Sequence, residues 1–141
     1  MRIIIAGAGA VGRHLAKLLS REDMDISLID DRQDRLGDLD ANYDLLTKVG
    51  SPMSIHDLKS IGVKDVDLFI AVTPSESDNI TACLLANQLG AKKTLARIDN
   101  YEYLIPENKR IFEQMAKMLL FMRLSKKKAS PPVKKIKSWG Y

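Results

Sequence analysis

The chain has 141 residues, of which 45% are hydrophobic and 28% are charged. This composition is that of an ordinary globular domain, and the length suits one domain with a buried core. The net charge is +4, but the residues after Glu113 carry eight of the 22 Lys and Arg residues and none of the 18 acidic ones. Residues 1–115 hold 14 positive against 18 negative charges. The folded part is therefore acidic, which argues against nucleic-acid binding.

No apolar run approaches the roughly 20 residues that a membrane-spanning helix needs. The N-terminus passes directly into a strand pattern without a secretory signal, so we expect a cytosolic protein. Cys83 is the single cysteine and lies among Ala82, Leu84 and Leu85. It cannot form an internal disulfide, and we expect a buried structural thiol.

The first predicted element is a strand at residues 3–5, followed by a glycine turn and a helix over residues 10–21. The turn reads GAGAVG over residues 7–12, which matches the GxGxxG pattern of dinucleotide-binding folds. Gly7 permits the turn, Gly9 leaves room for a pyrophosphate, and Gly12 lets the helix approach the strand. The free N–H groups at the helix start then face the anion. A glycine turn that binds nothing is the alternative.

A second buried strand is predicted at residues 26–29, and Asp30 follows it directly. Asp30 lies 18 residues past Gly12, a spacing that suits a carboxylate accepting hydrogen bonds from a ribose 2′-hydroxyl. This carboxylate would repel a 2′-phosphate, so the sequence favours NAD over NADP.

The remaining elements alternate in type. Helices are predicted over residues 32–39, 54–61 and 76–89, with Ser54 as a cap and with Gly62 and Gly90 as terminators. Strands are predicted over residues 43–49, 66–72 and 94–98. A last helix begins near Glu102 or Pro106 and carries, at helical spacing, Ile111, Phe112, Met115, Leu119 and Met122.

Alternation of strands and helices predicts an α/β fold, a Rossmann-like doubly wound parallel sheet of five to six strands in a single domain. In such a sheet the ligand crevice lies at the carboxyl ends of the strands. The glycine turn, Asp30, Gly50, Thr73 and Arg97 all fall at predicted strand ends.

With these positions in hand, residues 1–112 resemble the N-terminal nucleotide-binding domain of Trk-type potassium uptake regulators, a family also called RCK or KTN domains. Five segments carry the resemblance: GAGAVG at 7–12, LIDDRQDRL at 28–36, Gly50, AVTPSESDN at 71–79 and ARIDNYEYL at 96–104. The resemblance implies an RCK/KTN-type domain over residues 1–115. It also implies a cytosolic, non-enzymatic regulatory subunit or domain that binds NAD or NADH, or alternatively ATP or ADP.

The same resemblance implies a set of nucleotide-binding residues. Asp30 would hold the adenosine ribose, Asp31 and Arg32 would border the adenine, and Thr73 and Asn79 would lie close to the ligand. Arg97 would lie near phosphates or at a subunit contact, and a structural ion pair is the alternative. The full candidate set is Gly7, Ala8, Gly9, Ala10, Val11, Gly12, Asp30, Asp31, Arg32, Gly50, Ser51, Thr73, Asn79 and Arg97. No metal ligand or catalytic residue is expected, and His14 and His56 are interpreted as surface residues.

The partners implied are a membrane-embedded potassium transporter and further copies of the chain, as a dimer or a larger ring. The protein would then be cytoplasmic and peripheral to the inner membrane through its transporter. The apolar stripe of the last helix fits a homodimer, and packing onto its own sheet is the alternative. A small NAD-dependent oxidoreductase is the alternative function. It needs a proton-transfer group over the nicotinamide, which the sequence does not indicate.

The chain departs from the family after Gln114, where a glycine turn and a sixth strand are usual. Residues 116–141 instead form a basic, acid-free run with Pro131-Pro132. We interpret this run as a helix end and tail without a sixth strand. A truncation, a shifted reading frame and a genuine basic tail all remain open. We expect the tail from residue 126 onward to contribute nothing to nucleotide binding. Two roles are open for it: a solvated terminus without a function, or a segment that contacts anionic lipid.

Overall fold

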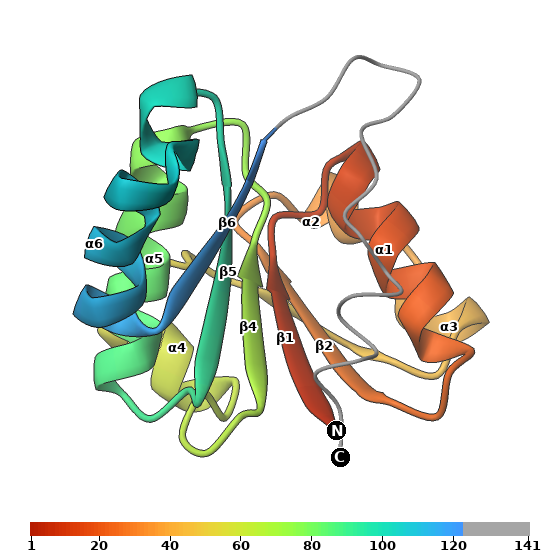
Figure 1. Ribbon diagram of the computed structural model, residues 1–141. Helices are drawn as coiled ribbons and strands as arrows, with labels where there is room; N and C mark the ends of the chain where they lie inside the picture. The colour runs from red at the N-terminus through yellow and green to blue at the C-terminus, as the bar shows by residue number, and fades with distance from the viewer. Residues whose placement is uncertain (123–141) are drawn as a thin grey trace.

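The computed structural model describes residues 1–122, which form a parallel sheet between two layers of helices (Figure 1). The strands are β1 (Arg2–Ala6), β2 (Asp25–Asp30), β3 (Leu46–Val49), β4 (Leu68–Ala71), β5 (Lys93–Ile98) and β6 (Met118–Met122). They lie in the order β3-β2-β1-β4-β5-β6, and every neighbouring pair is parallel. The predicted Rossmann-like doubly wound sheet is confirmed, with six strands.

The helices divide between the two faces of the sheet. On one face lie α1 (Ala10–Ser20), α2 (Gln33–Leu36) and α3 (Leu39–Asn42), and on the other lie α4 (Ile55–Ser60), α5 (Glu76–Gln88) and α6 (Pro106–Ala116), as Figure 1 shows. A short 3-10 helix, η1 (Tyr101–Leu104), links β5 to α6. The sheet is thus covered on both sides, which is the usual arrangement for parallel strands.

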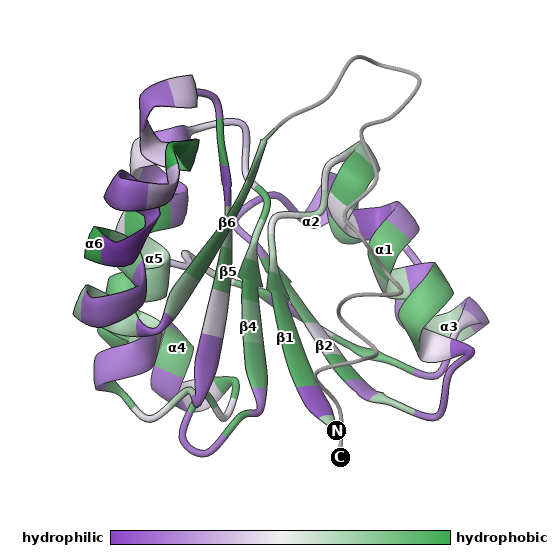
Figure 2. Cartoon of the chain, in the orientation of Figure 1, coloured by the Kyte–Doolittle hydropathy of each residue, from purple (hydrophilic) through white to green (hydrophobic). Residues whose placement is uncertain are grey.

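Each face of the sheet has its own hydrophobic core. Along β1, Ile3 and Ile5 point into the core beneath α1, while Ile4 points into the core on the opposite face. This alternation is the two-residue period of a strand, and burial on both faces explains why β1 is apolar almost throughout (Figure 2).

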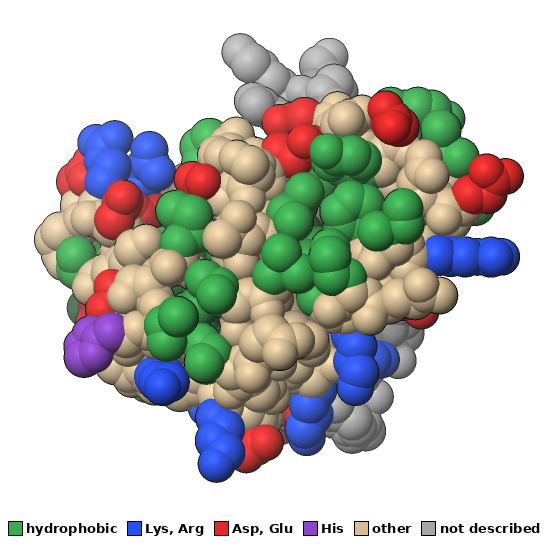
Figure 3. Space-filling view, turned by 90° about the vertical axis from the view of Figure 1, so that its left-hand side faces the viewer, with side chains coloured by type: hydrophobic (Ala, Val, Ile, Leu, Met, Phe, Trp, Pro, Cys, Tyr) green, Lys and Arg blue, Asp and Glu red, His purple; other side chains and the backbone are tan. Residues whose placement is uncertain are grey.

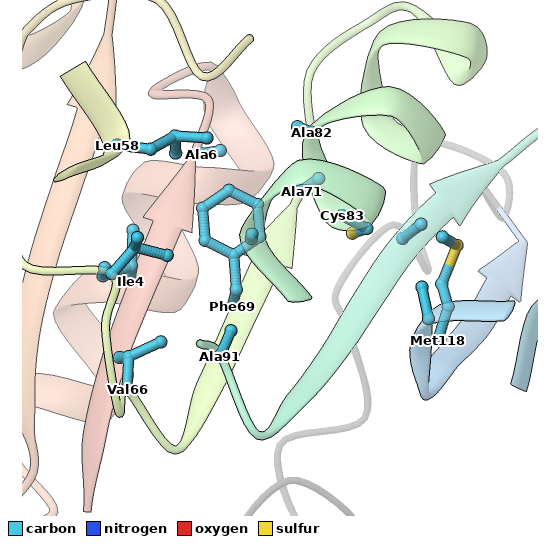
Figure 4. Close-up of a cluster of buried hydrophobic side chains, with 14 of the residues drawn as sticks. Ile4, Ala6, Leu58, Val66, Phe69, Ala71, Ala82, Cys83, Ala91 and Met118 are labelled. Carbon is cyan, nitrogen blue, oxygen red and sulfur yellow. The ribbon is translucent and has the colours of Figure 1, made fainter. Parts of the chain in front are cut away.

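The core beneath α4, α5 and α6 is centred on Phe69, whose ring lies among the side chains of several elements (Figure 4). Cys83 of α5 belongs to this core and is fully buried. Burial raises the pKa of its thiol to about 12, although hydrogen bonds with Thr94 and two backbone groups act in the opposite direction. The expected buried structural thiol is confirmed.

The C-terminal part of the described chain corrects the sequence analysis. The last helix ends at Ala116, so Leu119 and Met122 do not continue its apolar stripe but lie in β6. The expectation that no sixth strand follows Gln114 is therefore wrong. The chain turns at Lys117, which adopts a left-handed backbone (φ 47°), a conformation that glycine most often supplies at helix C-termini, and Leu119 then pairs with Leu95 of β5. The sheet therefore extends past residue 115.

The segment after β2 also differs from the prediction. Residues 32–39 were expected to form one helix, but α2 and α3 are separate four-residue helices. Gly37 between them has φ of +52°, outside helical geometry. The third strand begins at Leu46 and is shorter than the predicted residues 43–49.

The expectations for the basic tail concern residues that lie outside the described part of the chain. Within residues 1–122, no helix is long and apolar enough to span a membrane.

Candidate functional site

A cleft of about 180 Å³ opens at the carboxyl ends of the strands, between the loops that follow β1, β2, β3 and β4. Five of the sequence-predicted residues line it: Gly7, Asp30, Asp31, Ser51 and Thr73. Six further lining residues were not predicted: Arg35, Pro52, Met53, Pro74, Ser75 and Asp78. The cleft thus lies where the topology of a doubly wound sheet places ligands.

The glycine turn after β1 has the geometry that its sequence predicts. Gly7 has φ of +109°, which side chains other than glycine rarely tolerate, and its amide donates to the carbonyl of Ile29. A Cβ on Gly12 would lie 1.7 Å from the Gly7 carbonyl oxygen, so α1 approaches β1 as closely as predicted. Gly9 caps α1, and a Cβ there would meet no atom within 4 Å. The start of α1 is therefore open in front of Gly9.

Ala8, Ala10 and Val11 have different surroundings within this turn. Ala8 is fully buried, whereas Ala10 is exposed and Val11 is half-buried beside the core beneath α1. No acidic side chain lies in the first turn of α1. The positive end of the α1 dipole therefore has no carboxylate of its own helix beside it, which favours an anion there.

Asp30 ends β2 and is only 4% exposed. Its Oδ2 accepts from the Ala8 amide over 2.7 Å, and its Oδ1 accepts from the Arg32 amide over 2.8 Å. The Arg35 guanidinium lies 3.7 Å from Oδ2. Asp30 therefore ties the glycine turn to the start of the segment after β2.

Asp31 and Arg32, the next two residues, face different surroundings. Asp31 is exposed and lines the cleft. Arg32 does not line it, because its guanidinium forms two hydrogen bonds with the Asp34 carboxylate, over 3.1 and 2.8 Å. This pairing raises the pKa of Arg32 and lowers that of Asp34. The cation that lines the cleft is Arg35, the third residue of α2. Its position shortly after Asp30, at the start of a predicted helix, is the signal that could have identified it.

The loop after β3 is held by one carboxylate. Asp57 of α4 accepts from the Ser51 amide over 2.9 Å, and a Cβ on Gly50 would lie 2.8 Å from the same carboxylate oxygen. Ser54 caps α4 by accepting from the Asp57 amide, as predicted. Gly50 itself does not line the cleft, but its lack of a side chain lets Asp57 position Ser51 there.

Asn79 connects the ends of β4 and β5. It is fully buried, its Oδ1 accepts from the amide and the hydroxyl of Thr73, and its Nδ2 donates to the carbonyls of Thr73 and Arg97. The Arg97 guanidinium also donates to the Thr73 carbonyl, over 2.8 Å. Asn79 and Arg97 thus hold Thr73 at the cleft edge rather than lining the cleft themselves.

The start of α5 supplies part of the cleft that the sequence analysis missed. Ser75 caps α5 by accepting from the Asp78 amide, and both residues line the cleft. Glu76 lies beside them and accepts from the amides of Asp99 and Asn100, which fastens the end of β5 to this helix. Ser75 directly after Pro74 was the sequence signal that could have identified these residues. A capping residue just after a strand predicts that the next helix begins beside the crevice at the strand ends.

No group of His, Cys, Asp and Glu residues in the described chain has the arrangement of a metal site. His14 and His56 are both exposed, as predicted.

A parallel sheet in this order, with a glycine turn after its first strand and an acid after its second, defines a Rossmann-like domain of the nucleotide-binding class. The family model described as TrkA-N domain matches residues 3–118, and this chain belongs to the TrkA-N family. The resemblance identified from the sequence is thereby confirmed.

One relative is the Trk system potassium uptake protein TrkA of Haemophilus influenzae, which is 44% identical over 110 residues. The match covers 77% of this chain and 24% of the relative, so the chain spans about a quarter of that protein's length.

Solved structures show the same fold. The TrkA-N domain of the inner membrane protein ybaL from Escherichia coli has a TM-score of 0.72 and 16% identity, with 97% of this chain and 91% of that chain covered. The GsuK channel bound to NAD has a TM-score of 0.67 and 22% identity, with 84% of this chain and 21% of that chain covered. GsuK has also been solved bound to ADP, with a TM-score of 0.66 and 22% identity over 84% of this chain and 30% of that one.

Proposed function

We propose that this chain is the nucleotide-binding domain of a regulatory protein of a potassium uptake system, and that it binds NAD or NADH, or alternatively ATP or ADP. The observation that carries the proposal is the open start of α1 at Gly9, next to a cleft lined by Gly7, Asp30 and Asp31. An adenine nucleotide combines an anionic phosphate group with ribose hydroxyls. The helix start suits the first, and carboxylates suit the second.

Two kinds of similar protein support this assignment: relatives of the same family, and solved structures that contain a nucleotide. The relatives are potassium uptake proteins, and the GsuK channel has the same fold and is described with NAD and with ADP. The residues proposed to contact a nucleotide directly are those of the glycine turn together with Asp30, Asp31, Ser51 and Thr73. Gly50, Asn79 and Arg97 would act by positioning their neighbours.

The alternative, a small NAD-dependent oxidoreductase, fits the cleft less well. Hydride transfer to a carbonyl needs a group that delivers a proton at the nicotinamide. The residues lining the cleft are carboxylates, hydroxyls, one arginine and small or apolar side chains, with no His, Lys, Cys or Tyr among them. We therefore favour a binding domain that reports nucleotide occupancy.

The proposed output is control of a membrane-embedded potassium transporter. Two nucleotides that differ in their contacts with two conformations of the domain would shift the balance between those conformations. In this scheme the domain works at the cytoplasmic side of the inner membrane and reaches the membrane through the transporter.

We further propose that the domain works as a homo-oligomer. Four side chains of η1, α6 and the turn between them form what we call the helical apolar patch: Tyr101, Ile105, Ile111 and Met115, which are 71%, 38%, 57% and 45% exposed. Figure 3, which views the side of α4, α5 and α6, shows apolar side chains gathered there with charged ones around them. An apolar surface of this kind is typical of a subunit contact.

Thermal unfolding with NAD, NADH, NADP, ATP and ADP tests nucleotide binding. A ligand at 100 times its Kd stabilises the fold by about 2.7 kcal/mol, which raises Tm by several degrees. We expect NAD or NADH to raise Tm more than NADP does, because acids line the cleft. The Gly9→Val variant should keep the Tm of the free protein and lose the ligand response, since its side chain projects into open space. A wild-type Tm that no nucleotide moves at millimolar concentration would contradict the proposal.

Transporter control needs a separate test. The chain should bind the potassium transporter of its own organism in detergent, and the amount retained should change with the nucleotide present. The Gly9→Val variant should show no such change. Retention that is equal with every nucleotide would count against a regulatory role.

A further inference from the structure

Glu76 joins the wall of the cleft to the segment that follows β5. It is the first residue of α5 and follows Ser75, which lines the cleft. Glu76 is half-buried and does not line the cleft itself. Its Oε2 accepts from the amides of Asp99 and Asn100, which are 23 and 24 residues away in sequence. One carboxylate therefore connects the cleft wall to a loop that does not line the cleft.

The two amides that Glu76 binds are consecutive and belong to the loop in front of η1. Consecutive amides that converge on one oxygen form an anion-binding nest, and hydrogen bonds to a carboxylate are stronger than those to a neutral acceptor. Asn100 in turn caps η1, because its side chain accepts from the Glu102 amide over 3.0 Å. Glu76 thus holds the loop at the residue from which η1 begins.

The segment η1 and the helix α6 pack together as one unit. The Asn108 side chain of α6 donates to the Glu102 carbonyl over 2.8 Å, and the rings of Tyr103 and Phe112 have their centroids 5.0 Å apart. This unit carries the helical apolar patch, whose first residue, Tyr101, directly follows the loop. The position of the loop therefore sets the position of the patch relative to the cleft.

A second set of hydrogen bonds joins the same two segments. Asn79 accepts from the Thr73 amide and donates to the Arg97 carbonyl, and the Arg97 guanidinium donates to the Thr73 carbonyl. Asn79 is fully buried, so its replacement would destabilise the domain. The hydrogen bonds of Glu76 lie at the surface, and Glu76 can be replaced without opening either core.

We propose that Glu76 is a positioning residue that couples nucleotide occupancy of the cleft to association with a second copy of this chain through the helical apolar patch. A ligand that contacts Thr73, Ser75 or Asp78 orders the start of α5. Glu76 then holds the loop and η1 in one position, so association loses less conformational entropy at the patch. Nucleotide binding and association therefore strengthen each other. This inference rests on the nucleotide binding and the homo-oligomer proposed above.

The test measures association by analytical ultracentrifugation, without nucleotide and with saturating NAD or ADP. Equilibrium dialysis measures nucleotide affinity below and above the protein concentration at which the chain associates. Glu76→Ala removes the carboxylate, and Glu76→Gln keeps an acceptor oxygen without the charge. Asp40→Ala is the matched control, because Asp40 is an exposed acid in the first turn of α3, on the other face of the sheet, and does not line the cleft. Tm is measured for each variant.

The associated wild type should bind nucleotide about fivefold more tightly than the dissociated protein, at the lower end of usual allosteric coupling. For a dimer with two sites, this factor corresponds to about 25-fold tighter association at saturating nucleotide. Glu76→Ala should reduce the factor to less than about twofold, and Glu76→Gln should give an intermediate value. In both variants, the nucleotide affinity of the dissociated protein and association without nucleotide should stay within about threefold of wild type, as for other surface substitutions. Asp40→Ala should retain the full factor.

Coupling of wild-type size in Glu76→Ala would overturn the inference, and so would its loss in Asp40→Ala. If Glu76→Ala does not fold, coupling of wild-type size in Glu76→Gln has the same meaning. A wild type in which nucleotide leaves association unchanged or weakens it also overturns the inference. A wild type that binds nucleotide but stays monomeric shows that the proposed homo-oligomer has failed, and one that associates but binds neither NAD nor ADP shows that the proposed nucleotide binding has failed.

Discussion

Gly12 of α1 lies directly against Gly7 of the preceding turn, so that a Cβ on Gly12 would stand 1.7 Å from the Gly7 carbonyl oxygen and 2.9 Å from its carbonyl carbon. Both contacts are with backbone, which cannot move aside as a flexible side chain would. This relationship sets the distance between α1 and β1 and thereby the position of the helix start at the cleft.

Replacement of Gly12 by Ala should therefore destabilise the protein by about 1–3 kcal/mol or more, as overpacking of a filled interior does. Gly9→Ala is the matched control within the same turn. It should change the free energy of unfolding by less than about 1 kcal/mol, because the position is open and only a helix-cap preference is lost. Urea unfolding of the two variants measures the difference, and equal stabilities would contradict the close contact.

The amide of Asn79 should be important for stability because it is buried and serves four backbone or hydroxyl groups. Asn79→Ala removes the side-chain acceptor of the Thr73 amide and one hydrogen bond each from the Thr73 hydroxyl, the Thr73 carbonyl and the Arg97 carbonyl, and should cost about 3 kcal/mol. Asn42→Ala, which removes an exposed amide that donates to the Asp38 carbonyl, should change stability by less than about 0.5 kcal/mol. Chemical denaturation of both variants gives the comparison. A loss below 1 kcal/mol for Asn79→Ala would show that the groups find other partners.

Lys117 has a left-handed backbone between α6 and β6, a conformation that costs a side-chain-bearing residue about 1–2 kcal/mol. Lys117→Gly should therefore raise the free energy of unfolding by about 1 kcal/mol. Lys109→Gly, in the interior of α6, should lower it by a similar amount, because glycine is a poor helix former. Thermal unfolding of the two variants checks the opposite signs. A destabilised Lys117→Gly variant would contradict the turn described here.

The helical apolar patch predicts that association depends on Ile111. Ile111→Glu places a charge on the proposed apolar contact surface, where Ile111 is 57% exposed, and should convert the proposed oligomer to a monomer at tens of micromolar. Leu46→Glu is the control, since Leu46 is 71% exposed on β3 at the opposite edge of the sheet. Light scattering coupled to gel filtration measures the mass. A wild type that is monomeric, or a Leu46→Glu variant that dissociates equally, would oppose this interface.

Burial of Cys83 predicts a pH dependence of stability. Burial raises the pKa of this thiol in the folded protein to about 12 from its ordinary value of 9.0, so the folded state keeps the thiol proton more tightly than the unfolded state does. Below pH 9 the group contributes nothing to the pH dependence. As pH rises above 9, the unfolded chain ionises first, and stability should fall by about 1.4 kcal/mol per pH unit.

Cys83→Ala provides the comparison, because it removes the thiol while leaving the other titrating groups. The stability difference between wild type and variant should shrink steadily from pH 9 to pH 10.5. A difference that is constant over this range would show that the thiol is not held protonated.

The amino-acid sequence by itself determined the local elements and their class. The signals that the sequence carries lie within a few residues of the structure that they specify. They are the apolar runs at β1, β2, β4 and β5, the glycines at positions 7, 9 and 12, and the cap Ser54. Such short-range signals are readable without a structure. They were enough to predict a Rossmann-like sheet and a crevice at the strand ends, and to identify the TrkA-N family.

The tertiary structure alone decided which residues meet across the chain. Asp30 and Asp31 both line the cleft, but only the fold brings the Ala8 amide, 22 residues away, onto Asp30 and leaves Asp31 exposed. Residues 118–122 show no strand alternation, and they form β6 because β5 offers an unpaired edge and Lys117 accepts a left-handed turn. The contacts of Asp30 and the formation of β6 both depend on residues that are distant in sequence. A local sequence pattern does not predict the free energy of such long-range contacts.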